Sequence, residues 1–250
     1  MSGTGSVDRL SICKRPLLPP LMYQSWQKLL FVHWTLQPES LRPFVPSQLQ
    51  LDTFEGKAWI ALTPFIVRNF RLSFLPPLPF LSNYVELNVR TYVHRDGVPG
   101  VWFFSLDADS RLAVIAARAS FHLPYHDAEM SLREDGNVIH YSSMRRHASA
   151  PAPTFRASWK VEGPAVEAAP GSLEFFLVER YCLYAAEGRL LYRSRIFHHP
   201  WKLQNAVLLD FYSTMLETQG LPPQAGPPLL HYSHMQDASV WPLKEVSDVV

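Results

Sequence analysis

Prolines limit the length of any regular element that this chain can form. The 250 residues include 22 prolines, and a proline lacks the backbone N–H that a helix interior or a central strand requires. Short apolar stretches stand between the prolines, separated by turn residues and rich in aromatic side chains. This pattern predicts a mainly β fold of many short strands with only a few helices.

The clearest strand pattern covers residues 84–93, where side chains alternate between two faces. Asp96-Gly97 follows as a tight hairpin turn, and residues 101–106 form the expected partner strand. Two further hairpins are expected across Asp135-Gly136 and Glu187-Gly188. One face of the first strand carries the side chains of Tyr84, Glu86, Asn88, Arg90 and Tyr92.

That face allows two interpretations. In an open antiparallel sheet, a polar face usually meets water, and an exposed pair of Glu86 and Arg90 would contribute roughly 0 to 1 kcal/mol to stability. In a closed barrel, the same face would line the interior and could orient a small polar ligand. The strand pattern alone favours the solvent-facing interpretation.

Three segments are expected to be helical. Residues 111–120 carry Leu112, Ile115, Ala116 and Ala119 close to helical spacing, and Pro124 prevents continuation. Ser172 is expected to cap a short helix through Val178. Residues 202–219 are predicted to be the one long helix, ended by Gly220 and packed outside the sheet.

Residues 1–20 are expected to form a flexible N-terminal arm, and residues 21–250 a single domain, since no linker or repeat divides them. Residues 75–79 contain three prolines and are expected to form a loop that acts as a rim or lid.

Composition bears on partners and cofactors. A net charge of +1 gives no basic footprint for nucleic acid. The absence of a long apolar run and of a signal sequence predicts a cytoplasmic protein without a membrane partner. Both cysteines, Cys13 and Cys182, are expected to be reduced thiols. No nucleotide-binding motif is present and the ten histidines lack ligand spacing, so neither a cofactor nor a metal is expected.

Several segments resemble the YqjF-like proteins, a bacterial family of unknown function grouped with the acetoacetate decarboxylase-like superfamily. The resemblance covers nearly the whole chain and is carried by residues 31–34, 38–41, 45–46, 84–93, 99–107, 117–125, 178–181, 199–201 and 231–233. It implies a closed antiparallel β-barrel of the acetoacetate decarboxylase type, with a few peripheral helices and a small-molecule pocket, and a possible homo-oligomer.

The resemblance to the decarboxylases also implies what this chain lacks. Those enzymes attack a keto acid with a buried lysine that follows a Gly-Arg-Glu motif and a proline. Here Arg118 and Pro124 match the arginine and the proline, but the next residue is Tyr125. A phenol cannot condense with a carbonyl to form an imine. Glu86 matches the carboxylate of the decarboxylase Tyr-x-Glu motif, so one acid is retained and imine chemistry is not expected.

Three functions follow as alternatives. In the first, the chain is a binding module whose ligand contacts are Arg118, Arg90, Asn88, His33, Trp102 and Phe104. In the second, it is a lyase, hydratase or isomerase acting on a small oxo or hydroxy acid, with Glu86 as acid or base and Tyr125 or His122 as proton donor. In the third, the pocket is vestigial and Arg118 merely pairs with Glu86. Binding is slightly favoured over catalysis.

Overall fold

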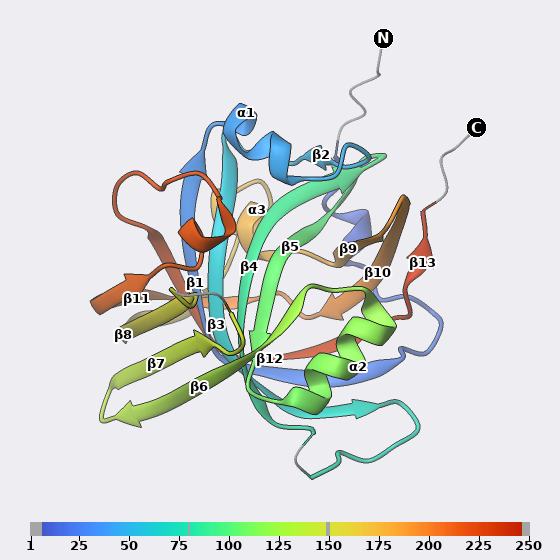
Figure 1. Cartoon of the computed structure of the whole chain (residues 1–250). Helices are drawn as coiled ribbons and strands as arrows, with labels where there is room; N and C mark the ends of the chain where they lie inside the picture. Colours follow the sequence, from blue (N-terminus) through green and yellow to red (C-terminus); the bar gives the residue numbers. More distant parts are fainter. Residues whose placement is uncertain (1–6, 80, 149–150, 247–250) are drawn as a thin grey trace.

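Strands dominate the computed structural model, which describes residues 7–79, 81–148 and 151–246 (Figure 1). The strands are β1 (Met22–Leu36), β2 (Gln50–Leu51), β3 (Ala58–Leu72), β4 (Tyr84–Arg95), β5 (Val98–Ala108), β6 (Tyr125–Asp135), β7 (Val138–Arg145), β8 (Thr154–Glu167), β9 (Cys182–Glu187), β10 (Leu190–His198), β11 (Lys202–Ser213), β12 (Leu229–Val240) and β13 (Lys244–Glu245). The α-helices are α1 (Pro38–Leu41), α2 (Arg111–Phe121) and α3 (Leu173–Val178), and 3₁₀ turns occur at Ser11–Cys13, Arg42–Phe44 and Glu217–Gln219.

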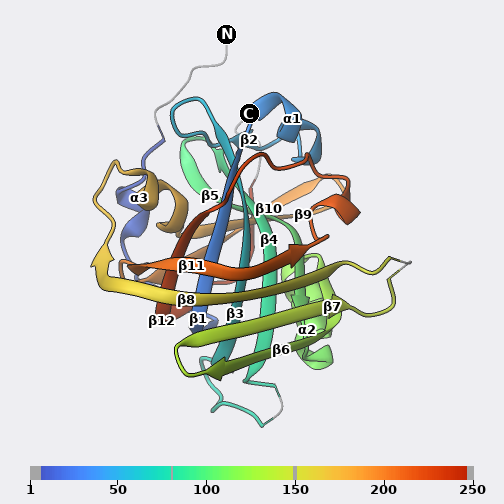
Figure 2. The same ribbon diagram turned by 90° about the vertical axis from the view of Figure 1, so that its left-hand side faces the viewer.

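The sheet closes on itself in two rings that share one wall. The shared wall runs β12–β1–β3–β4–β5. One ring, the β9–β10 ring, closes where β9 pairs with β5 and β10 pairs with β12. The other, the β6–β11 ring, closes through β6, β7, β8 and β11, which form the layer in front of the wall in Figure 2. The predicted mainly β architecture is confirmed. It is not wholly antiparallel, since β5 pairs in parallel with both β6 and β9.

Each ring encloses its own hydrophobic core. Inside the β9–β10 ring, Phe65, Phe103 and Leu183 belong to one buried cluster. Inside the β6–β11 ring, Leu87 and Trp159 belong to another. The strands of the shared wall are therefore covered on both faces, which is why the polar face of β4 does not meet bulk water.

Much of the predicted local structure is confirmed. The three hairpins β4–β5, β6–β7 and β9–β10 turn where the sequence indicates. The Ser172 side chain accepts a hydrogen bond from the Phe175 N–H at 3.1 Å and caps α3. Helix α2 forms as expected, but it buries Ala113, Val114 and Phe121, while Leu112 and Ile115 are exposed. Both sets have helical spacing, so periodicity alone does not select the buried face.

The predicted long helix over residues 202–219 is wrong, because most of this segment is strand β11. It pairs with β8 along nearly its whole length, and register shifts interrupt the pairing between Leu203 and Asn205 and between Leu208 and Asp210. A bulge adds one residue and reverses which face the following side chains occupy. At the second shift the extra residue, Leu209, belongs to β11, whereas at the first shift the extra residues belong to β8. The bulge in β11 breaks the period of two, and the remaining apolar spacing resembles a helix.

The described part of the N-terminal segment is held against the domain, which differs from the flexible arm expected over residues 1–20. Arg9 pairs with the buried Asp52, and the Arg195 guanidinium donates to the carbonyl of Ile12 at 2.7 Å. The Trp241 indole N–H donates to the carbonyl of Leu18 at 2.8 Å. Residues 1–6 lie outside the described residues. Both cysteines are free, and no described helix is long and apolar enough to cross a membrane.

Candidate functional site

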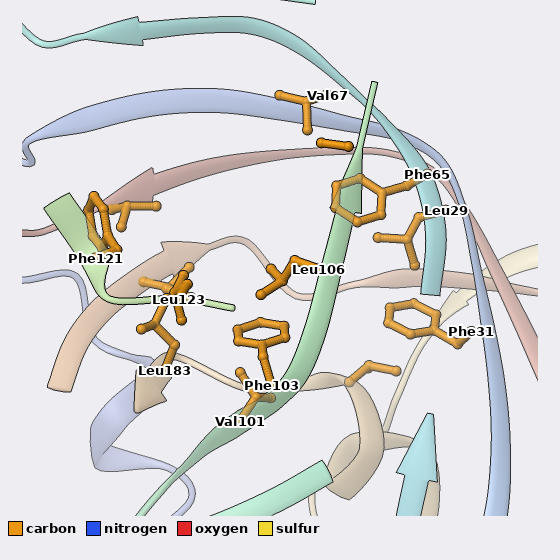
Figure 3. Close-up of a cluster of buried hydrophobic side chains, with 14 of the residues drawn as sticks. Leu29, Phe31, Phe65, Val67, Val101, Phe103, Leu106, Phe121, Leu123 and Leu183 are labelled. Atoms are coloured by element: carbon orange, nitrogen blue, oxygen red, sulfur yellow. The ribbon is translucent and has the colours of Figure 1, made fainter. Parts of the chain in front are cut away.

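A cavity of about 300 Å³ lies inside the β9–β10 ring. All seven strands of that ring contribute to its wall, together with α2 and the loop between β3 and β4. Most of the lining is apolar, and Figure 3 shows several of these side chains, with Leu29, Phe65, Phe103 and Leu106 extending from β1, β3 and β5. The proline-rich loop predicted as a rim does line the cavity, through Leu75, Pro76 and Leu78.

Strand alternation brings the polar face of β4 into this cavity. Glu86, Asn88 and Arg90 all line it. Residues directly opposite on neighbouring antiparallel strands share a face, so Phe65 and Thr63 of β3, which pair with Glu86 and Asn88, enter the same space. The interior-facing interpretation of the β4 pattern is therefore the one that the structure adopts.

Glu86 and Tyr125 form a hydrogen-bonded pair in the cavity. The Tyr125 hydroxyl donates to Oε2 of Glu86 at 3.1 Å, and both side chains are buried. From the other ring, the Tyr141 hydroxyl donates to the Glu86 carbonyl at 2.7 Å and fixes the strand there. Burial raises the pKa of Glu86 to about 8, although hydrogen bonds from Tyr125 and Asn88 oppose the shift. Burial also raises the pKa of Tyr125 well above its usual value. At neutral pH both groups therefore hold protons that they can donate.

Two arginines give a second part of the cavity a cationic character. The Arg180 guanidinium pairs with the buried Asp52 at 2.5 Å and lies 4.7 Å from the centre of the Tyr92 ring. Arg90 lies 5.8 Å from that ring centre and makes no ion pair within the described residues. A guanidinium without a carboxylate partner in a largely apolar cavity favours an anionic ligand.

Several polar atoms of the lining have no hydrogen-bond partner within the described structure. They are Thr63 Oγ1, Asn88 Oδ1, Arg90 Nε, Arg180 Nη2 and Trp201 Nε1. A buried polar group without a partner costs about 1–3 kcal/mol. These five atoms belong to residues that line the cavity, but the atoms themselves are buried and do not face the open space.

The structure brings four of the predicted site residues together in the cavity, and they are Glu86, Asn88, Arg90 and Tyr125. Arg118 lies elsewhere. Its side chain is exposed, and its Nε donates to the carbonyl of Tyr125 at 2.7 Å. Arg118 therefore neither lines the cavity, as expected for a ligand contact, nor pairs with Glu86, as in the vestigial alternative. It bonds to the Tyr125 backbone from outside the cavity and positions it.

The other predicted residues also lie outside the cavity lining. His122 ends α2 with a positive φ of 49° and contacts Glu187 at 3.3 Å. His33 is fully buried behind the cavity, where its Nε2 lies 2.6 Å from the Tyr92 hydroxyl. Trp102 and Phe104 pack on the opposite face of β5. In β5, a bulge leaves Phe104 unpaired between Phe103 and Ser105, so Phe103 and Leu106 are the residues that enter the cavity.

Sequence reasoning missed Arg180, Trp201, His198 and Trp26 as lining residues. A signal for two of them existed, because the segments 178–181 and 199–201 both carry the family resemblance. Burial lowers the pKa of His198 to about 4, so its imidazole is neutral at pH 7. Among the described residues that line the cavity there is no lysine. In the same part of the chain, no group of three or more His, Cys, Asp or Glu side chains is placed to hold a metal ion.

Comparison with solved structures places this architecture in the class of acetoacetate decarboxylase-like folds. The enduracididine biosynthesis enzyme MppR, in a complex with the condensation product of pyruvate and imidazole 4-carboxaldehyde, superposes with a TM-score of 0.66 at 12% identity, over 94% of this chain and 92% of that one. The acetoacetate decarboxylase of Legionella pneumophila gives a TM-score of 0.63 at 14% identity, over 100% of this chain and 98% of that one.

Sequence comparison gives the family. Residues 23–237 match DUF2071, described as an uncharacterized conserved protein. The chain is also 43% identical over 227 residues to the uncharacterized protein YqjF of Bacillus subtilis (strain 168), covering 91% of this chain and 93% of that protein. The chain therefore belongs to the DUF2071 family of YqjF-like proteins.

Proposed function

We propose that this protein binds a small organic anion in the cavity of the β9–β10 ring and does so without forming an imine. The observation that carries the proposal is the Arg90 side chain, which lines a largely apolar cavity and has no carboxylate partner among the described residues. A cavity of this size is at the lower end of the range for small-molecule sites. The protonated Glu86–Tyr125 pair supplies donors toward a neutral oxygen of the ligand, and Arg90 supplies the cation.

Two observations support the absence of imine chemistry. Tyr125 stands at the position where the resemblance to the decarboxylases expects the amine, and the described lining contains no lysine. Lys28 is the lysine of the inner strand β1. It adopts a positive φ of 54° in a bulge and pairs with Glu134 at 2.6 Å, on the side of β6.

A thermal-shift screen across oxo acids, lactones and aromatic acids tests the binding function. A ligand that binds only the folded chain raises the melting temperature by mass action. We expect carboxylates among the hits, and we expect Arg90→Gln to lose them. Arg156→Gln is the matched control, because Arg156 is exposed and pairs with Asp210 on the outer surface of β8 and β11. The absence of any hit, with the purified protein folded, would contradict the proposal.

Borohydride trapping tests the imine separately. Incubation with pyruvate or acetoacetate followed by reduction should leave the mass of the intact protein unchanged. A covalent adduct on any lysine would overturn the proposed absence of imine chemistry, while leaving the binding function in place.

One observation favours a second candidate, a lyase, hydratase or isomerase acting on a small oxo or hydroxy acid. A carboxyl group with a pKa of about 8 beside a phenol at 3.1 Å is suited to exchange a proton with a bound substrate near neutral pH. Glu86→Gln retains the shape and the hydrogen bonds of the protonated acid. A catalytic role predicts that this variant binds the screened ligand but loses its turnover. A binding role predicts no turnover in either protein.

The expected self-association stays a prediction. Light scattering after gel filtration measures the mass in solution, and a mass of one chain would contradict it.

A further inference from the structure

Aromatic side chains form one wall of the cavity, and their arrangement narrows the class of ligand. The indole rings of Trp26 and Trp201 are stacked, with centres 5.9 Å apart and planes 9° from parallel. Phe65 meets Trp26 edge to face at 6.3 Å. We call these three residues, all of which line the cavity, the aromatic wall. Rings prefer offset-stacked or edge-to-face neighbours, so such a wall offers favourable contacts to another ring.

Arg90 and Trp201 both lie beside the same buried ring, that of Phe31. The Phe31 ring contacts both groups, since its centre is 5.1 Å from that of Trp201 and 5.3 Å from the Arg90 guanidinium carbon. Packing alone accounts for rings in a core, but it does not account for a guanidinium without a carboxylate partner beside them, as Arg90 is among the described residues.

The volume and the length of the cavity limit the ligand further. A cavity of about 150 Å³ accommodates benzene, so about 300 Å³ holds one ring with substituents. Glu86 and Arg90 lie four residues apart on one face of β4, which is roughly 13 Å along a strand. The polar groups therefore stand at two separate places along the cavity, with the aromatic wall beside them.

We propose that the ligand is an aromatic carboxylate, whose ring packs on the aromatic wall and whose carboxylate pairs with the Arg90 guanidinium. This inference rests on the proposed binding function and adds the chemical class of the ligand. The guanidinium provides charge complementarity to the carboxylate. A ligand oxygen at the far end would meet the Glu86–Tyr125 pair.

The probes are three compounds of nearly equal shape: 3-phenylpropanoate, 3-cyclohexylpropanoate and 3-phenylpropanamide. Calorimetric titration of the full chain gives the affinity of each. We expect 3-phenylpropanoate to bind about ten-fold or more tightly than either of the others, because 3-cyclohexylpropanoate lacks an aromatic ring and the amide lacks the charge.

Two variants locate the contacts. Arg90→Gln should remove most of the preference for the acid over the amide. Trp201→Phe replaces the indole of the aromatic wall with a smaller ring, so it should weaken binding of 3-phenylpropanoate about three-fold or more. Trp159→Phe is the matched control, because Trp159 is equally buried and its Nε1 is also unpartnered, but it lies in the core of the β6–β11 ring. This control should leave the affinity unchanged, and unfolding curves of all variants check that they fold.

The outcomes separate this inference from the proposed function. If 3-cyclohexylpropanoate or the amide binds as tightly as 3-phenylpropanoate, the cavity binds small molecules but the aromatic carboxylate is wrong. If Trp201→Phe behaves as Trp159→Phe does, the indole contact is wrong. If none of the three compounds binds and the wider screen also gives no ligand, both the inference and the binding function are contradicted.

Discussion

The most informative single residue is Glu86, a carboxyl group buried between aromatic and apolar side chains. Its surroundings contain the Tyr125 hydroxyl and Phe65 but no described cation within ion-pair distance. Desolvation therefore outweighs hydrogen bonding, and the acid keeps its proton in the folded chain at neutral pH.

This raised pKa makes the stability of the fold depend on pH. The Glu86 pKa is about 8 in the folded chain against an ordinary value of 4.5, so between these values the folded state binds the proton and the unfolded state does not. Rising pH then favours unfolding by about 1.4 kcal/mol per pH unit from this group. Glu86→Gln should remove that contribution, so it should gain stability relative to the natural chain as pH rises from 5 to 8. Urea unfolding at several pH values measures the difference, and parallel stability curves would contradict the prediction.

At the same scale, Asp52 holds two arginines from distant parts of the sequence. Its carboxylate pairs with Arg180 at 2.5 Å and with Arg9, and both Asp52 and Arg180 are buried. Asp52→Ala would leave the Arg180 cation buried without its partner, which should cost about 3–5 kcal/mol of unfolding free energy. Asp210→Ala breaks the exposed pair with Arg156 and should cost less than about 1 kcal/mol. Chemical denaturation of both variants tests the contrast, and equal losses would contradict it.

Among the elements, β5 pairs with β4 and also in parallel with both β6 and β9, so it takes part in closing both rings. Gly100 lies where β5 approaches β9. A Cβ atom there would stand 2.7 Å from Cε2 of Tyr184 and 3.0 Å from the carbonyl oxygen of Cys182. The close approach of β5 to β9 closes the β9–β10 ring, and only a glycine at position 100 leaves room for the Tyr184 ring.

Gly100→Ala should therefore destabilise the protein by about 1–3 kcal/mol through overpacking. Thermal or urea unfolding gives the loss. In a Tyr184→Leu background the nearest atoms are removed, so the cost of Gly100→Ala should fall. If Gly100→Ala leaves the unfolding free energy of the otherwise natural chain unchanged, β9 moves aside without penalty and the prediction is contradicted.

Among the helices, strands and turns, some features could be predicted from the sequence and others could not. Hairpins and the α3 cap depend on a few neighbouring residues, such as Asp96-Gly97 and Ser172, and were predicted correctly. Bulges depend on pairing with a distant strand, and they caused the errors at β11 and at Phe104. Arg118 was assigned to the pocket because it matches the arginine of the decarboxylase motif, and such a match does not determine which side of α2 faces the cavity.

At the scale of the whole molecule, the shared wall explains why a face rich in polar residues is buried. Strands β1, β3 and β4 are covered by the β6–β11 ring on one side and by the β9–β10 ring on the other. One strand can then carry apolar residues such as Leu87 toward a packed core and Glu86 toward a cavity. Alternation alone could not separate this arrangement from a solvent-facing sheet, because both produce the same pattern.

The shared wall also predicts that the two rings unfold together. If the β6–β11 ring opened alone, the faces of β1, β3 and β4 that carry Leu30, Ile60 and Leu87 would lose their cover of Phe155 and Trp159 and meet water. Exposure of each such side chain costs roughly 1.5–3 kcal/mol, so a half-open state lies close to the fully unfolded state in free energy. Hydrogen exchange followed by mass spectrometry should therefore give amides of β7 and β9 the same opening free energy and the same urea dependence. If β7 exchanges at clearly lower urea than β9, the rings are independent units and the shared wall does not couple them.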